Sequence, residues 1–280
     1  MNFIEILKVL LFGLVEGYTE WLPISSTGHL ILVEEIVKLN QPDAFWNVFL
    51  VVIQLGAILA VVVLYWHKLN PFSPKKNRVQ RQNTWTLWTK IILACIPAAV
   101  VGVPLDDFLD TYLHGPVVVA LMLILYGFVF IWLERRNRDR SFAIGRTVEL
   151  DYKTALLIGA FQCLSLIPGT SRSGATIIGA MLLGCARPVA AEFSFFLGVP
   201  VMFGASLLKL VKYFLDGNVF SGSQVFLLLL GMLVSFIVAV YTIKYLMSYI
   251  RKHDFTVFGY YRIVLGVIVI LFFGIRALAA

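Results

Sequence analysis

Two polar segments interrupt an otherwise apolar sequence, and the first begins with a pair of glutamates. Glu16 and Glu20 are four residues apart, so on a helix both side chains lie on one face. Carboxylates inside an apolar segment are costly to bury, which makes them candidates for function. Together they would hold a divalent cation, Mg²⁺ or Ca²⁺, through oxygen ligands, or would share one proton. The alternative is that they only neutralise Arg172.

Hydroxyl groups and a histidine follow in residues 24–29 (ISSTGH). Pro23 ends the preceding helix, and three short side chains then suit a helix N-cap: Ser25, Ser26 and Thr27. A helix N-terminus binds phosphate through its free N–H groups and its dipole. If the helix begins here, His29 lies within reach of the Ser25 or Ser26 hydroxyl and could act as general base, general acid or phosphate-accepting nucleophile. A hydrogen-bonded structural histidine is the alternative.

The second polar segment, residues 168–176 (PGTSRSGAT), combines a turn with hydroxyl groups and one arginine. Pro168 and Gly169 force the turn, and three hydroxyl side chains follow: Ser171, Ser173 and Thr176. The planar guanidinium of Arg172 suits two phosphate oxygens. We therefore predict a phosphate clamp here. The simpler alternative is a helix cap in which Arg172 pairs with Glu20.

The composition places these segments in a membrane protein. Hydrophobic residues make up 60% of the 280 positions and charged residues only 14%, which is too few for the surface of a soluble protein of this length. The mean hydropathy is +0.87. Six apolar runs are long enough to cross a bilayer as helices. The sequence predicts an all-α polytopic protein with one membrane domain, residues 1–280, whose spans are residues 43–66, 85–104, 116–134, 188–214, 224–250 and 255–277.

Each polar segment joins two apolar stretches that are too short to span, which predicts two re-entrant helix hairpins, residues 4–39 and 153–185. A shift of 146 residues superimposes polar and glycine positions of the two hairpins: Gly13 on Gly159, Glu16 on Gln162, Ser25 on Ser171 and Gly28 on Gly174. We therefore predict two repeats, residues 1–134 and 151–280, each with one hairpin and three spans. Because three is odd, the second repeat is inserted upside down, and binding sites lie where the broken helices of such repeats meet.

The basic residues orient the spans. Lysines and arginines gather in the connections 65–90 and 134–153 and at Arg251 and Lys252, whereas the alternate connections hold acidic residues: Asp106, Asp107, Asp110 and Asp216. By the positive-inside rule the basic side is cytoplasmic, so both termini and the mouth of the first hairpin face outward. The net charge of +7 is explained by these orientation signals, and we predict no nucleic-acid partner.

Both motifs together resemble those of the bacitracin-resistance type undecaprenyl-diphosphate phosphatases. Glu16 and Glu20 followed by Pro23 and SSTGH are similar to the first motif of that family, and residues 168–176 are similar to its second motif, PGxSRSxxT. The similarity extends over the whole chain. It implies hydrolysis of undecaprenyl diphosphate to undecaprenyl phosphate and inorganic phosphate in the bacterial plasma membrane, which regenerates the lipid carrier for cell-wall synthesis. Because the topology places the mouth of the first hairpin outside, we predict that the reaction occurs at the outer face. A homodimer is expected only from this resemblance.

Roles for the site residues follow from the chemistry that the resemblance implies. A phosphate clamp would be formed by Arg172 with Ser171, Ser173 and Thr176. Glu16 and Glu20 would hold Mg²⁺ or Ca²⁺, or would orient His29. Ser26, His29 or water would attack the terminal phosphorus. Inverted repeats also suit a transporter or flippase for a lipid phosphate, and a membrane scaffold is the third reading. Convergence of Glu, Ser, His and Arg favours an enzyme.

Overall fold

The computed structural model describes residues 2–113 and 115–279, with side chains at all of these except 103, 106–111 and 279. In this part of the chain the secondary structure is helical, and no strand longer than a single bridge is found. Six helices are long and apolar enough to cross a membrane: α3 (Asp43–Leu64), α5 (Arg78–Leu113, apolar over Arg78–Gly102), α6 (Pro116–Asn137), α9 (Arg187–Leu215), α10 (Gly222–Tyr249) and α11 (Thr256–Ala279). The predicted all-α, multi-pass architecture is confirmed.

Two pairs of shorter helices form at the polar segments. The first pair is α1 (Phe3–Thr19) and α2 (Ser26–Ile36). The second is α7 (Tyr152–Gln162) and α8 (Arg172–Leu182), which are joined through the 3-10 turn η2 (Cys163–Leu166). In both pairs the turn that joins the two helices contains a proline, Pro23 or Pro168, and the first helix has ended before that proline. The turns lie inside the molecule, because Trp21, Leu22 and Ile24 of the first and Thr170 of the second are buried.

Two of the predicted spans, residues 43–66 and 85–104, differ in their bounds from the helices of the structure. The run predicted as 43–66 stops at Leu64 and is followed by one short turn, α4 (Trp66–Leu69). The run predicted as 85–104 is the centre of a longer helix, α5, which begins at Arg78 and continues past Pro97 and Pro104. The helix begins earlier than predicted because hydropathy does not detect its polar first turns. It continues past the two prolines because proline inside a spanning helix is tolerated where neighbouring groups satisfy the freed carbonyls.

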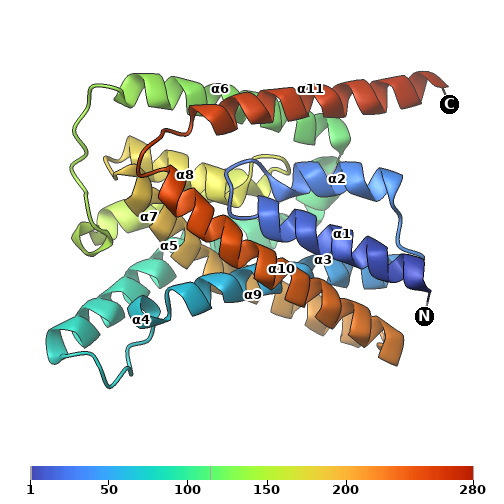
Figure 1. Cartoon of the computed structure of the whole chain (residues 1–280), viewed down its shortest axis with the longest axis horizontal. Coiled ribbons are helices and arrows are strands. Elements are labelled where there is room, and N and C mark those ends of the chain that lie inside the picture. Colours follow the sequence, from blue (N-terminus) through green and yellow to red (C-terminus); the bar gives the residue numbers. More distant parts are fainter. Residues whose placement is uncertain (1, 114, 280) are drawn as a thin grey trace.

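Small residues allow the helices to approach closely. A Cβ atom at Gly56 of α3 would lie 2.1 Å from the Met232 carbonyl oxygen of α10. The first helix of each hairpin packs in the same way on a spanning helix of the other half of the chain: α1 on α10 through Gly13, and α7 on α5 through Gly159 (Figure 1). Close contact through glycine is the usual way in which membrane helices associate.

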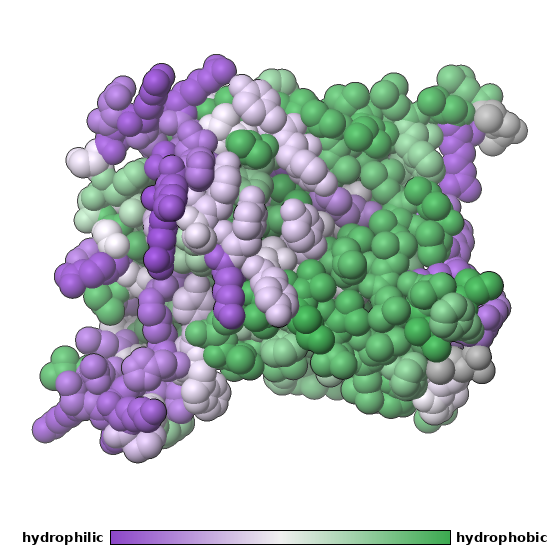
Figure 2. All heavy atoms as spheres, in the orientation of Figure 1, coloured by the Kyte–Doolittle hydropathy of each residue, from purple (hydrophilic) through white to green (hydrophobic). Residues whose placement is uncertain are grey.

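The surface separates into an apolar face and a polar end. Figure 2 shows hydrophobic side chains over most of the face, and hydrophilic ones gathered at the end that holds α4 and the start of α5. Large apolar side chains of the spanning helices are exposed, among them Leu208, Leu233 and Val264. An exposed apolar face of this extent is expected where the surrounding medium is lipid.

Candidate active site

The two polar turns have the same backbone geometry. Ser25 and Ser171 have φ values of 70° and 72°, and they are the only non-glycine residues with positive φ in the described part of the chain. Each serine is the N-cap of the following helix, and each hydroxyl accepts a hydrogen bond from a backbone N–H three residues on, at Gly28 (3.4 Å) and Gly174 (3.2 Å). Such backbone strain costs about 1–3 kcal/mol per residue and is concentrated at functional sites.

One carboxylate joins the two hairpins. The Ser26 hydroxyl donates to Oε2 of Glu20 at 2.8 Å, and Nη2 of Arg172 donates to Oε1 of the same carboxylate at 3.2 Å. All three residues are largely buried. The structure therefore brings together three of the predicted catalytic residues, and it places a hydroxyl, a base and a cation in one continuous chain of contacts.

The guanidinium of Arg172 is held from several sides. Nη1 donates to the Ser194 carbonyl of α9 at 2.9 Å, and the group lies over the ring of Trp21 at 5.1 Å from its centroid. A Cβ atom at Gly198 would lie 2.6 Å from Nη1, so this glycine makes room for the cation. Nε has no hydrogen-bond partner among the described residues. A bound anion would give this buried donor an acceptor.

Glu16 lies one helical turn before Glu20 and is fully buried. Neither of its carboxylate oxygens has a hydrogen-bond partner among the described residues. A buried carboxylate without a partner is costly, so a proton or a cation is expected beside it. No group of three or more His, Cys, Asp and Glu side chains that could hold a metal ion occurs in the described part of the chain. Two carboxylates are nevertheless enough for Mg²⁺, which takes its remaining ligands from water and substrate phosphate.

Both ring nitrogens of His29 have partners other than the serine hydroxyls. Nδ1 contacts the backbone carbonyl of Ser25 at 2.7 Å, and Nε2 contacts the hydroxyl of Tyr261 at 2.7 Å, with the two rings stacked. Since a carbonyl can only accept, Nδ1 carries a proton, and a neutral His29 accepts at Nε2 from Tyr261. Sequence reasoning missed Tyr261.

The hydroxyl groups of the second motif connect helices in this structure. Ser173 donates to the backbone carbonyls of Glu20 (3.3 Å) and Leu22 (3.4 Å). Thr176 is fully buried and contacts the Ser194 hydroxyl at 2.6 Å, while Ser171 contacts Ser173 at 3.2 Å. Thr27 of the first motif is half-buried. These contacts fix the two turns against each other, and phosphate binding by these hydroxyls stays a prediction.

Arg262 is a second buried arginine, and sequence reasoning missed it as well. From α11 it donates to three backbone carbonyls, that of Pro23 in the first turn (3.1 Å) and those of Gly169 and Thr170 in the second (both 2.9 Å). The sequence does contain a signal for Arg262, which is its position within an apolar span. Arginines are rare in such spans and mostly face a functional interior. One side chain thus holds both turns.

Known proteins resemble this chain over nearly its whole length. The family model described as bacitracin resistance protein BacA matches residues 9–268. A protein of Limosilactobacillus fermentum named undecaprenyl-diphosphatase is 57% identical over 98% of this chain and 99% of its own length. Proteins with the same name from Enterococcus faecalis and Streptococcus mutans are 54% and 57% identical, and cover 96% and 98% of this chain and 98% of their own lengths.

Proposed function

This chain belongs to the bacitracin resistance protein BacA family, and we propose that its activity runs through the contact chain of Ser26, Glu20 and Arg172. The protein is a multi-pass membrane phosphatase that hydrolyses undecaprenyl diphosphate to undecaprenyl phosphate and inorganic phosphate. This reaction recycles the lipid carrier for peptidoglycan synthesis, and the family implies bacitracin resistance. A transporter is not favoured by these relatives.

The observation that carries the proposed mechanism is the 2.8 Å hydrogen bond from the Ser26 hydroxyl to Glu20. Glu20 accepts the hydroxyl proton while Oγ of Ser26 attacks the terminal phosphorus. The bond from that phosphorus to the bridging oxygen breaks, and undecaprenyl phosphate leaves. Water then attacks the phosphoserine, the bond between Oγ and phosphorus breaks, and a proton returns to Oγ. A nucleophile within hydrogen-bond reach of its base is the arrangement that this chemistry needs.

Arg172 supplies positive charge to the same reaction. Its free Nε and the helix N-terminus at Ser171 would face the transferred phosphoryl group, whose negative charge spreads over three oxygens in the transition state. Burial keeps water away from the guanidinium and strengthens its attraction to phosphate. The remaining hydroxyls, Thr27, Ser173 and Thr176, would position the turns around the substrate. The ring of His29 would be held in its orientation by the Ser25 carbonyl and the Tyr261 hydroxyl.

In this proposal a divalent cation, Mg²⁺ or Ca²⁺, would lie beside Glu16. Both oxygens of this carboxylate lack partners among the described residues, whereas those of Glu20 already contact Ser26 and Arg172. When bound, the cation would neutralise the diphosphate and polarise the phosphoryl oxygens. Glu16 would hold the cation, and Glu20 would complete its coordination only by sharing an oxygen. Removal of the cation by a chelator should therefore stop the reaction.

The proposed architecture is an inverted repeat with its site open to the outer face of the membrane. The repeat is supported by the positive φ values of Ser25 and Ser171 and by the equivalent packing of Gly13 and Gly159, each pair 146 residues apart. The outward orientation is supported by the basic connections. A membrane-impermeant thiol reagent added to intact cells tests it: Val219→Cys should react and Ser141→Cys should not, and the opposite pattern would contradict the orientation.

Phosphate release from undecaprenyl diphosphate by the purified protein tests the mechanism. Loss of a general base costs about 10²–10⁴-fold in rate, so Glu20→Gln should lose at least a hundredfold in kcat, and Ser26→Ala should be as slow or slower. Ser141→Ala, in an exposed connection, is the matched control and should have wild-type activity. Mass spectrometry of a quenched reaction should find phosphate on Ser26. Undiminished turnover in Ser26→Ala would exclude it as the nucleophile.

A further inference from the structure

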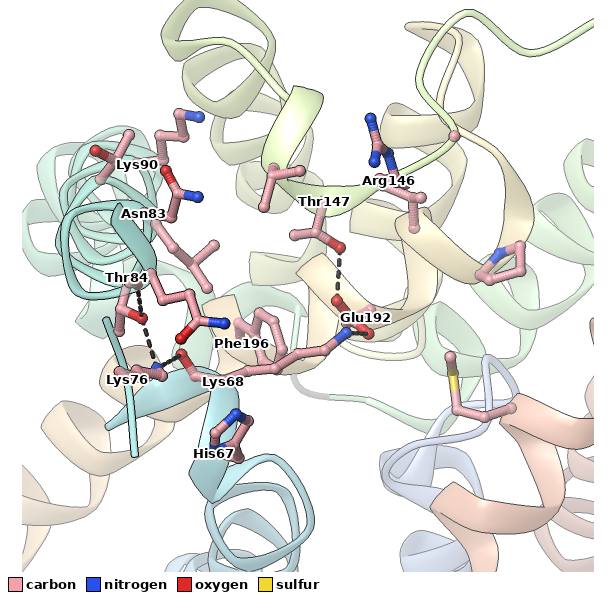
Figure 3. Close-up of a pocket in the computed structure, with 18 of the residues that line it drawn as sticks. His67, Lys68, Lys76, Asn83, Thr84, Lys90, Arg146, Thr147, Glu192 and Phe196 are labelled. Carbon is pink, nitrogen blue, oxygen red and sulfur yellow. Dashed lines mark hydrogen bonds and ion pairs between the residues drawn. The ribbon is translucent and has the colours of Figure 1, made fainter. Parts of the chain in front are cut away.

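A cavity lies at the polar end of the molecule, among connections to which the proposed phosphatase mechanism assigns no role. It has a volume of about 460 Å³ and lies between α4, α5, α9, α10 and the 3-10 turn η1 (Thr147–Glu149) (Figure 3). This volume is within the range of small-molecule binding pockets. Its lining carries one carboxylate, Glu192, and five cationic side chains: Lys68, Lys76, Lys90, Arg146 and Arg251.

Two of these cations are paired with carboxylates. Figure 3 shows Lys68 of α4 extending across the cavity to Glu192 of α9, and Thr147 meeting the same carboxylate from η1. Both contacts are 2.6 Å long. Arg146 pairs with Glu149 at 2.7 Å. The only lining carboxylate is therefore already in use.

The other three cations have no carboxylate within ion-pair distance in the described part of the chain. Lys76 is buried and donates only to neutral oxygens, those of Lys68, Asn70 and Thr84. Lys90 is also buried, and its ammonium lies over the ring of Tyr152, 5.6 Å from the centroid. Arg251 is exposed at the end of α10. Asp151 is the acid that interacts with Lys90 electrostatically, but it makes no ion-pair contact with it. Buried cations without a carboxylate in direct contact favour the binding of an anion.

The walls of the cavity are apolar, which restricts the kind of anion. Several lining side chains carry no polar group: Leu87, Val148, Pro188, Val189, Phe196 and Met247. A cavity with a cationic lining and apolar walls, at the end of membrane-spanning helices, suits an amphiphile better than a fully hydrated ion. Basic pockets of this kind between transmembrane helices bind lipid headgroups.

The cavity is separate from the Ser26–Glu20–Arg172 site. None of these three residues lines the cavity, and two neighbouring, fully buried rings of α9 contact different regions: Phe195 packs on Trp21 beside Arg172, while Phe196 lines the cavity and packs on Tyr65. On the same helix Glu192 faces the cavity and the Ser194 carbonyl accepts from Arg172. An anion bound at the cavity would therefore not compete for the catalytic groups.

We propose that this cavity is a binding site for the phosphate monoester headgroup of a membrane lipid. Lys76, Lys90 and Arg251 provide the charge, and the apolar wall accepts the first part of the lipid chain. The proposal does not depend on the catalytic mechanism, because its test measures binding and not hydrolysis.

Binding is measured with the purified full-length protein in detergent micelles, by titration with dioleoyl phosphatidic acid and, separately, with dioleoyl phosphatidylcholine and inorganic phosphate. The wild type should bind phosphatidic acid and not phosphatidylcholine, and added salt should weaken the binding. Each cation near a phosphate is worth about fivefold in affinity, so Lys90→Gln/Arg251→Gln should weaken binding about 25-fold. Arg251→Gln alone changes an exposed residue and should leave the fold intact. It should weaken the binding of phosphatidic acid about fivefold.

The matched control is Arg135→Gln/Arg138→Gln, which removes two exposed charges from the same polar end but outside the cavity, and it should bind as the wild type does. Equal affinity of the cavity variants and the control would overturn the proposal. So would loss of phosphatidic acid binding in Arg172→Ala but not in the cavity variants, because the lipid would then be in the catalytic site. Displacement of phosphatidic acid by an equal concentration of inorganic phosphate would overturn the assignment to a lipid.

Discussion

Substitution of Arg262 by lysine tests whether one buried side chain positions both polar turns for catalysis. The guanidinium spans the two turns, with Nη1 on the Pro23 carbonyl and Nη2 on the carbonyls of Gly169 and Thr170. A lysine keeps the charge but has a single nitrogen, which can reach one turn or the other. Arg262→Lys should therefore release one turn while the buried charge is retained.

The expected loss follows from the hydrogen bond that is given up. A hydrogen bond to a charged group contributes about 1.5–3 kcal/mol, and release of the first turn displaces the helix that carries Ser26. If this energy is lost in the transition state, kcat falls about tenfold to a hundredfold. Arg262→Met loses both contacts and should be slower still, although removal of an unpaired buried charge offsets part of its cost in stability.

The assay measures kcat and KM for undecaprenyl diphosphate well below the melting temperature, together with Tm. Arg276→Lys is the control, because Arg276 lies on the same helix and pairs with Glu35 at the surface. A positioning role predicts a lower kcat in the order wild type, Arg262→Lys, Arg262→Met, with the control unchanged. If Tm falls in that order while kcat per folded molecule stays constant, Arg262 only stabilises the fold and the reasoning is refuted.

Three further predictions concern neighbouring contacts. Tyr261→Phe removes the hydroxyl on His29 and should lower kcat/KM about two- to tenfold, whereas exposed Tyr260→Phe should not. Gly56→Ala should destabilise the fold by about 1–3 kcal/mol as measured by Tm, whereas Gly204→Ala, with open space, should not. Asp151 caps α7, and its hydrogen bond to Thr154 lowers the pKa of the carboxyl below the usual 3.8. Asp151→Ala should cost about 1 kcal/mol near neutral pH. That difference should shrink as pH falls below 3.8, because protonation in the folded state removes the charged acceptor.

Residue types and spacing were enough to predict that Glu20, Ser26 and Arg172 come together, and their catalytic roles stay a prediction. Pairing of Glu20 with Arg172 is the simpler alternative that the sequence offers to a phosphate clamp, and the structure contains that contact. It does not exclude the clamp, because Nε of Arg172 remains without a partner among the described residues. The two pairs of short helices and the six spans were predictable for a related reason, since polar groups inside long apolar runs are rare and therefore informative.

The contacts of His29 could not be predicted from spacing. Reach to a hydroxyl of Ser25 or Ser26 requires a free hydroxyl, but that of Ser25 caps the helix and that of Ser26 is bound to Glu20. Nδ1 of His29 therefore donates to the backbone carbonyl of Ser25, one helical turn earlier in the chain. Tyr261 is 232 positions away in sequence, and only the packed fold brings it to His29. Local pattern carries no information about such pairs.

The two hairpins carry different charged side chains, and the proposed active site therefore needs both of them. Gln162 occupies the position in the second hairpin that Glu16 occupies in the first, and both side chains are buried without hydrogen-bond partners among the described residues. A second acid at Gln162 would add another charge without a partner in the same interior, and the cost of burying it would be several kcal/mol. An amide avoids that cost. The acids therefore stay in one hairpin and Arg172 in the other, so the opposite charges meet only when the two turns are held together, as Arg262 holds them.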